Sequence, residues 1–478
     1  MNQFIIGRTA QKQELTEALA STKPEMLALV GRRRVGKTYL VSQVYAEHID
    51  FEITGLQYGN KRDQIENFML KMSKHFPNYK LEKMPKSWLK AFDHLTLALE
   101  GLEKQAKMVV FLDELPWLAT PKSGFLTGLS YFWNSWGVKQ NIVVVICGSA
   151  ASWMIKKVIN NRGGLHNRVT RLLFLYPFTL AETAAYCLAS NIKLNQYQIL
   201  QLYMVMGGIP MYLDQIKPGL SVIQNIQKIC FAPSGYLRHE FERLFASLFK
   251  DYQKHVAIVR ALASKRKGLT RQEIIQTTKL TNSGKLTDIL YELESSGFLT
   301  IYGGYGKKVK ESLYRLTDAY SLFYLTFLEP LGKSNQLDFN KLSDLPLWKT
   351  WSGYTFENIC LTHIDQIRKA LSIAGMTSSI ASFVTRPKDG LPGAQIDLLI
   401  DRSDQSINIC EIKFSIEDYV VTKKDVDNIQ TKKKVFRYHS KTKKHLFTTL
   451  ITTMGVVENS HKVNFIDQVV TLKDLFLE

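Results

Sequence analysis

Short apolar runs rich in β-branched residues alternate with longer segments of helical periodicity in the N-terminal part of the chain. The runs are residues 26–30 (MLALV), 51–54, 108–112 (MVVFL) and 142–147 (IVVVIC). Runs of this length indicate buried strands, and strands that alternate with helices favour a parallel sheet covered on both faces. The pattern therefore predicts an α/β fold for this part of the chain.

The pattern turns helical between residues 175 and 250. Phe178, Leu180, Ala184, Ala185 and Leu188 recur at spacings that predict one apolar helix face. We therefore expect the sheet to be followed by a set of helices.

The pattern of apolar and polar positions changes again over residues 251–320. Helical patterns over 255–263, 271–277 and 285–295 precede a Gly-rich hairpin, FLTIYGGYGKKVKESLYRLTD, and Thr270 with Glu273 forms a predicted capping box. Three short helices and a β-ribbon indicate a winged helix. A polar segment, LGKSNQLDFNKLSD, then leads to a last α/β segment that begins near Trp348.

Composition narrows the class of protein. With 478 residues and 45% hydrophobic residues, the chain has enough apolar side chains for several cores, which excludes wholesale disorder. The formal charge of +19 is spread along the chain and favours a polyanionic partner such as nucleic acid, nucleotide or anionic lipid. Five scattered cysteines match neither a disulfide framework nor a zinc site, and no long apolar run occurs, so we expect a soluble cytoplasmic protein without membrane contact.

A phosphate-binding motif follows the first predicted strand. Residues 31–38 read GRRRVGKT, which satisfies G-x-x-x-x-G-K-[ST] between a strand and a helix. Backbone N–H groups of Gly31 to Gly36 would wrap phosphates, Lys37 would reach the β and γ oxygens, and Thr38 would bind Mg²⁺. The predicted ligands from this loop are Gly31, Arg32, Arg33, Arg34, Val35, Gly36, Lys37 and Thr38.

Two further strands end in residues that suit the same site. MVVFL is followed by Asp113 and Glu114, which would hold Mg²⁺ and polarise the attacking water. The strand IVVVIC is followed by Gly148 and Ser149, whose hydroxyl would lie beside the γ-phosphate. A solvated acidic turn and a plain loop serine are the structural alternatives.

These residues resemble the archaeal-type ATPases of the AAA+ and STAND class. The resemblance spans roughly residues 1–345 and rests on FIIGR at 4–8, the three-arginine loop, Asp113-Glu114, Gly148-Ser149 and GGIP at 207–210. It implies that Gly7, Arg8 and Pro210 flank the adenine. It also implies an arginine sensor or finger among Arg162, Arg168 and Arg171, of which Arg168 matches best; surface arginines are the alternative.

The winged helix raises a question of DNA contact. In a helix-turn-helix the exposed side of the helix KLTDILYELESSG would enter the major groove, with Lys285, Lys307, Lys308 and Lys310 on phosphates. Glu292 and Glu294 on that helix weaken this interpretation. A protein-interaction or lid role is the alternative.

The C-terminal segment carries a carboxylate and lysine cluster. Asp397 lies on one predicted strand, and Glu411 and Lys413 lie two residues apart on the next, so all three share a face if the strands form a hairpin. Two carboxylates beside a lysine suit a Mg²⁺ site that orients water, and Glu357 on a preceding helix could add a carboxylate. Charged residues on a solvated strand edge are the alternative.

This D…E-x-K pattern resembles the PD-(D/E)XK nuclease superfamily and, at the end of such an ATPase, a DUF234-type domain. The proline of the pattern is absent, since Gln395 and Ile396 precede Asp397. A basic helix follows, with cations that should attract a phosphate backbone unless they only form a solvated face: Lys432, Lys433, Lys434, Arg437, Lys441, Lys443 and Lys444.

The sequence thus predicts four parts: a P-loop ATPase core over 1–175, a helical lid over 176–250, a winged helix over 251–345 and a nuclease-like α/β domain over 346–478. We expect an ATP- and Mg²⁺-dependent ATPase that couples nucleotide state to DNA binding or cleavage. The alternative is a slow ATPase switch with a non-cleaving DNA- or protein-binding C-terminal domain. Assembly into a homo-oligomer or with a partner protein stays open.

Overall fold

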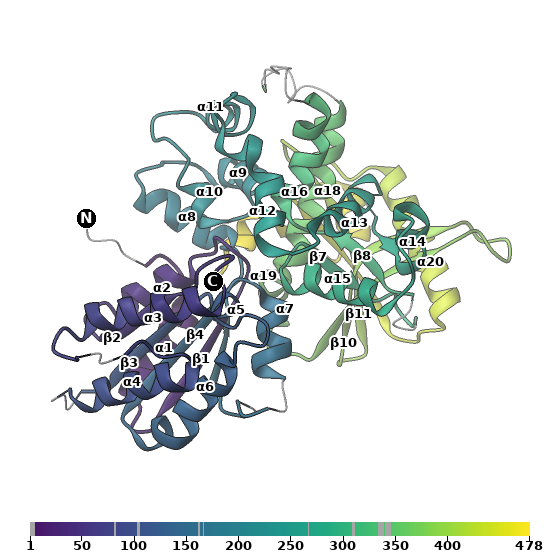
Figure 1. Cartoon of the computed structure of the whole chain (residues 1–478). Coiled ribbons are helices and arrows are strands. Elements are labelled where there is room, and N and C mark those ends of the chain that lie inside the picture. Colours follow the sequence, from purple (N-terminus) through teal and green to yellow (C-terminus); the bar gives the residue numbers. More distant parts are fainter. Residues whose placement is uncertain are drawn as a thin grey trace. The chain divides into compact units, whose positions relative to one another are not determined.

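The computed structural model describes residues 5–80, 83–102, 106–160, 163–165, 167–265, 267–307, 311–332, 339 and 346–478. The chain divides into two compact units, Met1–Pro177 and Phe178–Glu478. Figure 1 draws both, coloured along the sequence.

The first unit is built around a parallel sheet of order β2-β3-β4-β1-β5. Every residue of β1 and β4 is buried, so both faces of the sheet are covered. Its elements are α1 (Thr9–Ala20), β1 (Glu25–Val30), α2 (Lys37–Val44), β2 (Ile49–Thr54), α3 (Lys61–His75), α4 (Trp88–Glu100), β3 (Met108–Asp113), α5 (Leu115–Leu118), α6 (Phe125–Tyr131), η1 (Phe132–Trp136), η2 (Gly137–Lys139), β4 (Ile142–Gly148), α7 (Ala151–Met154), η3 (Ile155–Ile159) and β5 (Arg171–Phe174).

The four predicted strands of this unit are confirmed as β1 to β4, and their parallel pairing is confirmed as well. The fifth strand, β5, has only four residues and begins with Arg171, which is why no apolar run marked it. The order of the sheet places β4 between β1 and β3. Because the strands are parallel, their carboxyl ends, and the residues that follow them, lie at one edge.

The second unit begins with helices, as predicted. They are α8 (Leu180–Ala189), α9 (Gln196–Met206), α10 (Pro210–Leu213), α11 (Val222–Ile226), η4 (Gln227–Phe231), η5 (Tyr236–His239) and α12 (Glu240–Leu248). The expected apolar face of α8 is partly wrong: the helix buries Leu180, Thr183 and Cys187, while Leu188 is 70% exposed. Thr183 is polar, so a pattern of apolar positions does not mark it as buried.

The predicted winged helix is present. It comprises α13 (Tyr252–Ser264), β6 (Leu269–Thr270), α14 (Arg271–Thr278), α15 (Gly284–Ser295), β7 (Leu299–Tyr302) and β8 (Leu313–Leu316), with a sheet of order β6-β8-β7. The capping box of Thr270 and Glu273 is confirmed. The chain continues through α16 (Ala319–Phe323), η7 (Tyr324–Leu328) and η8 (Glu329–Leu331).

The last part of the second unit holds a mixed sheet of order β13-β12-β11-β10-β9. β9, β10 and β11 are antiparallel neighbours, whereas β12 is parallel to β11 and β13 is parallel to β12. The elements are α18 (Pro346–Thr362), α19 (Ile364–Ala370), β9 (Ser378–Thr385), β10 (Ala394–Arg402), β11 (Ser406–Lys413), α20 (Lys423–Ser440), β12 (His445–Thr452), α21 (Ser460–Phe465), β13 (Gln468–Thr471) and η9 (Leu472–Phe476).

None of the helices in the described part of the chain is both long and apolar enough to cross a membrane.

Candidate functional site

The loop between β1 and α2 has the backbone geometry of a phosphate cradle. A Cβ atom on Gly31 would lie 2.3 Å from the carbonyl oxygen of Leu175, so only glycine fits there. Gly36 has φ 89° and Arg34 has φ 74°, which bends the chain tightly before α2 begins at Lys37. Backbone N–H groups of such a loop, together with the N-terminus of α2, attract anions.

Lys37 is buried inside this loop. Its Nζ donates to the carbonyl oxygens of Gly31 and Arg32, each at 2.9 Å. The ammonium group is therefore held where the phosphates of a nucleotide are expected.

Thr38 and Asp113 meet although 75 residues separate them in sequence. The Thr38 hydroxyl donates to Oδ2 of Asp113 at 2.8 Å. Burial raises the pKa of Asp113, and the bond from Thr38 opposes that shift. A hydroxyl beside a carboxylate is an oxygen pair of the kind that Mg²⁺ prefers.

Glu114 and Ser149 form the second contact of this site. Glu114 has φ 48°, an uncommon backbone conformation that turns the chain directly after β3. The Ser149 hydroxyl contacts both carboxylate oxygens of Glu114, at 2.5 and 2.7 Å, and the Ser149 N–H donates to Oε2 at 3.1 Å. The structure therefore brings Ser149 to the predicted base, a contact that sequence reasoning had missed.

The arginines near the loop differ in their surroundings. Arg8 follows Gly7 (φ 62°), and its Nη2 donates to the carbonyl oxygen of Val35 at 3.1 Å, so Arg8 reaches the loop. Arg32 is buried, and the guanidinium of Arg33 lies 5.4 Å from the ring centre of Trp117.

The remaining predicted nucleotide contacts lie farther along the chain. Arg168 is exposed in a turn, whereas Arg171 forms ion pairs with Glu14 and Glu17, at 2.6 and 3.0 Å. Arg162 lies outside the described residues. Pro210 begins α10 in the second unit. Arg171 is thus engaged by acids of α1, and the sensor role of Arg168 stays a prediction.

A glycine loop between β1 and α2, a lysine inside it, and carboxylates at the end of β3, two places away in the sheet, define a P-loop nucleotide-binding site. Residues 6–216 match the family described as the ATPase domain predominantly from Archaea. This part of the chain is therefore an archaeal-type P-loop ATPase, as the sequence indicated.

Relatives and solved structures were found over longer stretches. An uncharacterized protein of Methanocaldococcus jannaschii is 22% identical over 417 residues, which is 86% of this chain and 88% of that protein. A Walker-type ATPase of Pyrococcus abyssi is 19% identical with a TM-score of 0.46, covering 67% of this chain and 96% of that one. The ORC2 protein of Aeropyrum pernix is 13% identical with a TM-score of 0.40, covering 68% and 95%.

The second cluster lies on β10 and β11. These strands pair antiparallel up to Leu398 and Cys410, so Asp397 and Glu411, one step beyond, lie side by side. Lys413 shares their face because it is two residues from Glu411. The hairpin that the sequence analysis required is therefore confirmed. A register shift between Ile396 and Leu399 against β9 marks a bulge at Asp397, a feature common beside functional residues.

Both carboxylates of this pair already have protein partners. Glu411 forms ion pairs with Lys413, at 3.1 Å, and with Lys432 of α20, at 2.6 Å. Gln395 donates to Asp397. Burial lowers the pKa of Lys413, but Glu411, Tyr419 and Asp425 together outweigh it, and the pKa is raised overall.

Glu357, on α18, joins the cluster in a different way. Its Oε2 lies 2.8 Å from Nη2 of Arg315, on β8. Burial raises the pKa of Glu357 to about 7, and the nearby charges of Asp397 and Glu411 act in the same direction. Among the described residues no three His, Cys, Asp or Glu side chains are arranged to hold a metal ion, so the role of Glu357 as a ligand stays a prediction.

The seven cations in and after α20 have different surroundings in the structure. Lys432, Lys433 and Lys444 form ion pairs with Glu411, Asp467 and Asp401. The other four cations are exposed: Lys434, Arg437, Lys441 and Lys443.

The predicted DNA contacts of the winged helix also have partners. Lys285 forms an exposed ion pair with Asp251, at 2.9 Å, and Nζ of Lys307 donates to the carbonyl oxygen of Val384. Lys308 and Lys310 lie outside the described residues.

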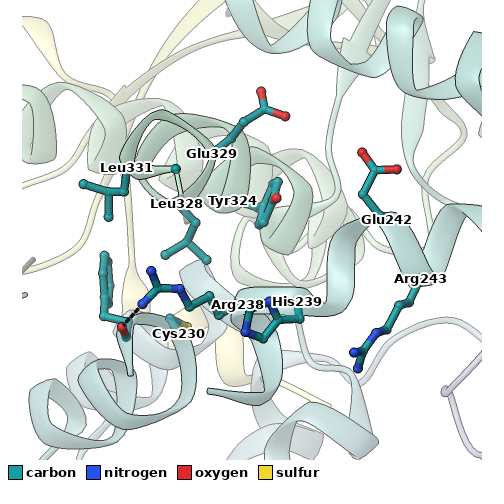
Figure 2. Close-up of a pocket in the computed structure, with 11 residues that line it drawn as sticks. Cys230, Arg238, His239, Glu242, Arg243, Tyr324, Leu328, Glu329 and Leu331 are labelled. Atoms are coloured by element: carbon teal, nitrogen blue, oxygen red, sulfur yellow. Dashed lines mark hydrogen bonds between the residues drawn. The ribbon is translucent and has the colours of Figure 1, made fainter. Parts of the chain in front are cut away.

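A separate pocket of about 350 Å³ lies among the helices of the second unit. Figure 2 shows Arg238, Tyr324 and Glu329 among the residues around it, with Arg238 donating to the carbonyl oxygen of Phe231. None of the predicted site residues lines this pocket.

Proposed function

We propose that this ATPase couples its nucleotide state to DNA held by the second unit, and that Asp397, Glu411 and Lys413 form a metal-dependent nuclease site there. The observation that carries the proposal is the side-by-side position of Asp397 and Glu411 with Lys413 on the same face. A strand-borne pair of carboxylates beside a lysine is the constellation that metal-assisted phosphodiester cleavage needs.

On the nucleotide side, each residue has a role that fits its contacts. Lys37 binds the β and γ phosphate oxygens in exchange for its two carbonyl partners. Thr38 and Asp113 offer the oxygens that would hold Mg²⁺, which supplies charge neutralisation at the phosphates. Glu114, oriented by Ser149, accepts a proton from the attacking water. Gly7 and Arg8, in the same unit as the loop, are assigned to the adenine.

On the DNA side, the four exposed cations of the α20 segment offer the charge. Lys434 and Arg437 lie on one helix, and Lys441 and Lys443 lie just beyond its end. Contacts of this kind bind a phosphate backbone without reading a sequence. Asp397 and Glu411 would then hold the metal, and Lys413 would position the water.

The second candidate function is a slow ATPase switch whose C-terminal domain binds DNA or a protein without cleaving. The contacts of Glu411 favour it, because two lysines already neutralise this carboxylate. A site with its charge fully compensated attracts a divalent cation weakly.

Cleavage of single-stranded, duplex and branched DNA with Mg²⁺ or Mn²⁺, with and without ATP, separates the two functions. The nuclease proposal expects cleavage by the wild type and its loss in Asp397→Ala and Lys413→Ala. Asp427→Ala and Lys462→Ala, on the surface of the same domain, are matched controls that should cleave normally. Absence of cleavage by a preparation that binds ATP supports the switch instead.

A further inference from the structure

The wing of the winged helix, which comprises β7, residues 303–307 and β8, pairs with the edge of the C-terminal sheet. Gly304 forms a parallel bridge with Ser382 of β9; the Tyr305 N–H donates to the Ser382 carbonyl at 2.8 Å, and the Ser382 N–H donates to the Gly303 carbonyl at 3.1 Å. Both segments belong to the same compact unit. The wing thus covers backbone groups of β9 that an edge strand would otherwise expose.

Side chains extend this contact. Tyr305 packs against Phe436 of α20 with ring centres 5.0 Å apart, inside an apolar cluster formed by β9, β10, β11 and α20. Asn358 of α18 donates to the carbonyl oxygen of Leu316 on β8 at 3.0 Å. The two strands of the wing are therefore held to the C-terminal domain at several points, and not only through Lys307.

Arg315 carries a charge from the wing into the carboxylate cluster. It lies on β8, its side chain is 6% exposed, and its Nη2 lies 2.8 Å from Glu357. Glu357 is close enough to Asp397 and Glu411 for their charges to act on it. Three cations pair with carboxylates of this cluster: Arg315 with Glu357, and both Lys413 and Lys432 with Glu411. Lys413 also lies 3.7 Å from Asp425.

We propose that the winged helix keeps the C-terminal site closed to metal, with Arg315 occupying Glu357 in place of a divalent cation. This inference rests on the proposed metal site of the second unit and concerns how metal binding at that site is regulated. While the wing is docked, cations occupy Glu357 and Glu411, so these carboxylates offer a divalent cation little attraction. Withdrawal of β8 removes Arg315, frees Glu357 as a third oxygen ligand and leaves the cluster negative.

This regulation is tested by measuring Mn²⁺ binding to the full chain, without nucleotide, by titration calorimetry. We expect Arg315→Met to tighten Mn²⁺ binding at least tenfold, whereas Arg315→Lys keeps the charge and stays within threefold of the wild type. Arg368→Met is the matched control, because Arg368 bonds the carbonyls of Ala374 and Met376 in the same domain, outside the cluster. Unchanged or weaker binding in Arg315→Met would overturn the inference.

A second pair of variants guards against misfolding, since loss of one partner from a buried ion pair destabilises a protein strongly. In Glu357→Gln the charge of Arg315 stays beside the site without its partner. The double variant Glu357→Gln with Arg315→Met removes both charges, so it must bind Mn²⁺ at least tenfold more tightly than Glu357→Gln alone. Equal affinities of the two would overturn the inference.

Asp397→Asn distinguishes a failure of the proposed metal site from a failure of its proposed regulation. If this change leaves Mn²⁺ binding of the wild type and of Arg315→Met untouched, the proposed metal site itself is wrong, and its regulation falls with it. If the binding depends on Asp397 but is equal in the wild type and in Arg315→Met, the site stands and the closed state is wrong.

Discussion

The two charged sites of this chain hold their carboxylates in opposite ways. In the first unit, Asp113 accepts a hydrogen bond from Thr38 and Glu114 accepts from Ser149, so hydroxyl groups orient the acids without cancelling their charge. In the second unit, Glu411 and Glu357 are ion-paired with cations that come from three different elements.

This difference separates a site that is ready for its ligand from one that must first rearrange. Preorganised polar groups bind without the cost of reorientation. Ion pairs inside a protein must be broken before their members bind anything else. We therefore expect nucleotide binding to need little movement and metal binding at Asp397 and Glu411 to need the release of cations.

The largest expected effect is at Lys37. Lys37→Ala removes the charge inside the loop, so ATP affinity should fall at least about 100-fold, as a buried phosphate contact of several kcal/mol requires. Binding of a fluorescent ATP analogue measures it, with the exposed Lys74→Ala as control. Retained affinity would mean that the first site is not where nucleotide binds.

The next largest expected effect is on ATP hydrolysis, at Glu114 and its partner Ser149. Glu114→Gln should keep ATP binding and lower the rate of hydrolysis about 100-fold or more, because the role proposed for this residue is that of the base. Ser149→Ala, which removes the contact that orients Glu114, should lower kcat with little change in KM. A steady-state comparison of the three proteins measures both, and a change in KM alone would contradict the assignment.

A buried histidine makes the unit that holds the second site sensitive to acid. His363 accepts from the Leu180 N–H at 3.1 Å, and burial lowers its pKa to about 4. Because the unfolded chain binds the proton near pH 6.5, stability is complete above that pH and falls as the pH drops towards 4. The loss is about 3 kcal/mol at 1.4 kcal/mol per pH unit.

Hydrogen exchange of the segment 346–370 at pH 7 and pH 4.5 measures this loss. His363→Gln, which keeps an acceptor but does not titrate, should exchange with a smaller dependence on pH. An equal dependence in both proteins would assign the acid sensitivity to other groups.

The smallest expected effect is on DNA affinity. Replacing the four exposed cations of the α20 segment by glutamine should weaken DNA binding about tenfold and lower the salt slope by about 3. A matched variant with four exposed cations of the first unit replaced serves as control: Lys61, Arg62, Lys74 and Lys80. Equal losses in the two variants would show that the attraction is only that of the net charge.

The loop and strands that carry the first site could be predicted from the sequence because each is marked by a contiguous pattern. The loop from Gly31 to Thr38 is contiguous, and an acid after an apolar strand must lie at the edge of a parallel sheet where the loop also lies. The bond of Ser149 to Glu114 was missed because it depends on a side-chain rotation after β4 that no spacing encodes.

The second site was predicted only in part. Strand alternation put Glu411 and Lys413 on one face, and a hairpin brought Asp397 to them. Arg315 and Lys432 come from β8 and α20, and nothing in the local pattern links these to Glu357 or Glu411. The docking of the wing on β9 is likewise a tertiary contact between segments far apart in sequence.

The central claim is that the nucleotide state controls how the second unit binds DNA. The most direct test measures DNA affinity with a non-hydrolysable ATP analogue, with ADP and without nucleotide. The account predicts at least a fivefold difference between the ATP and ADP states of the wild type, and its disappearance in Lys37→Ala. Equal affinity in all three states, in a wild type shown to bind ATP, would contradict it.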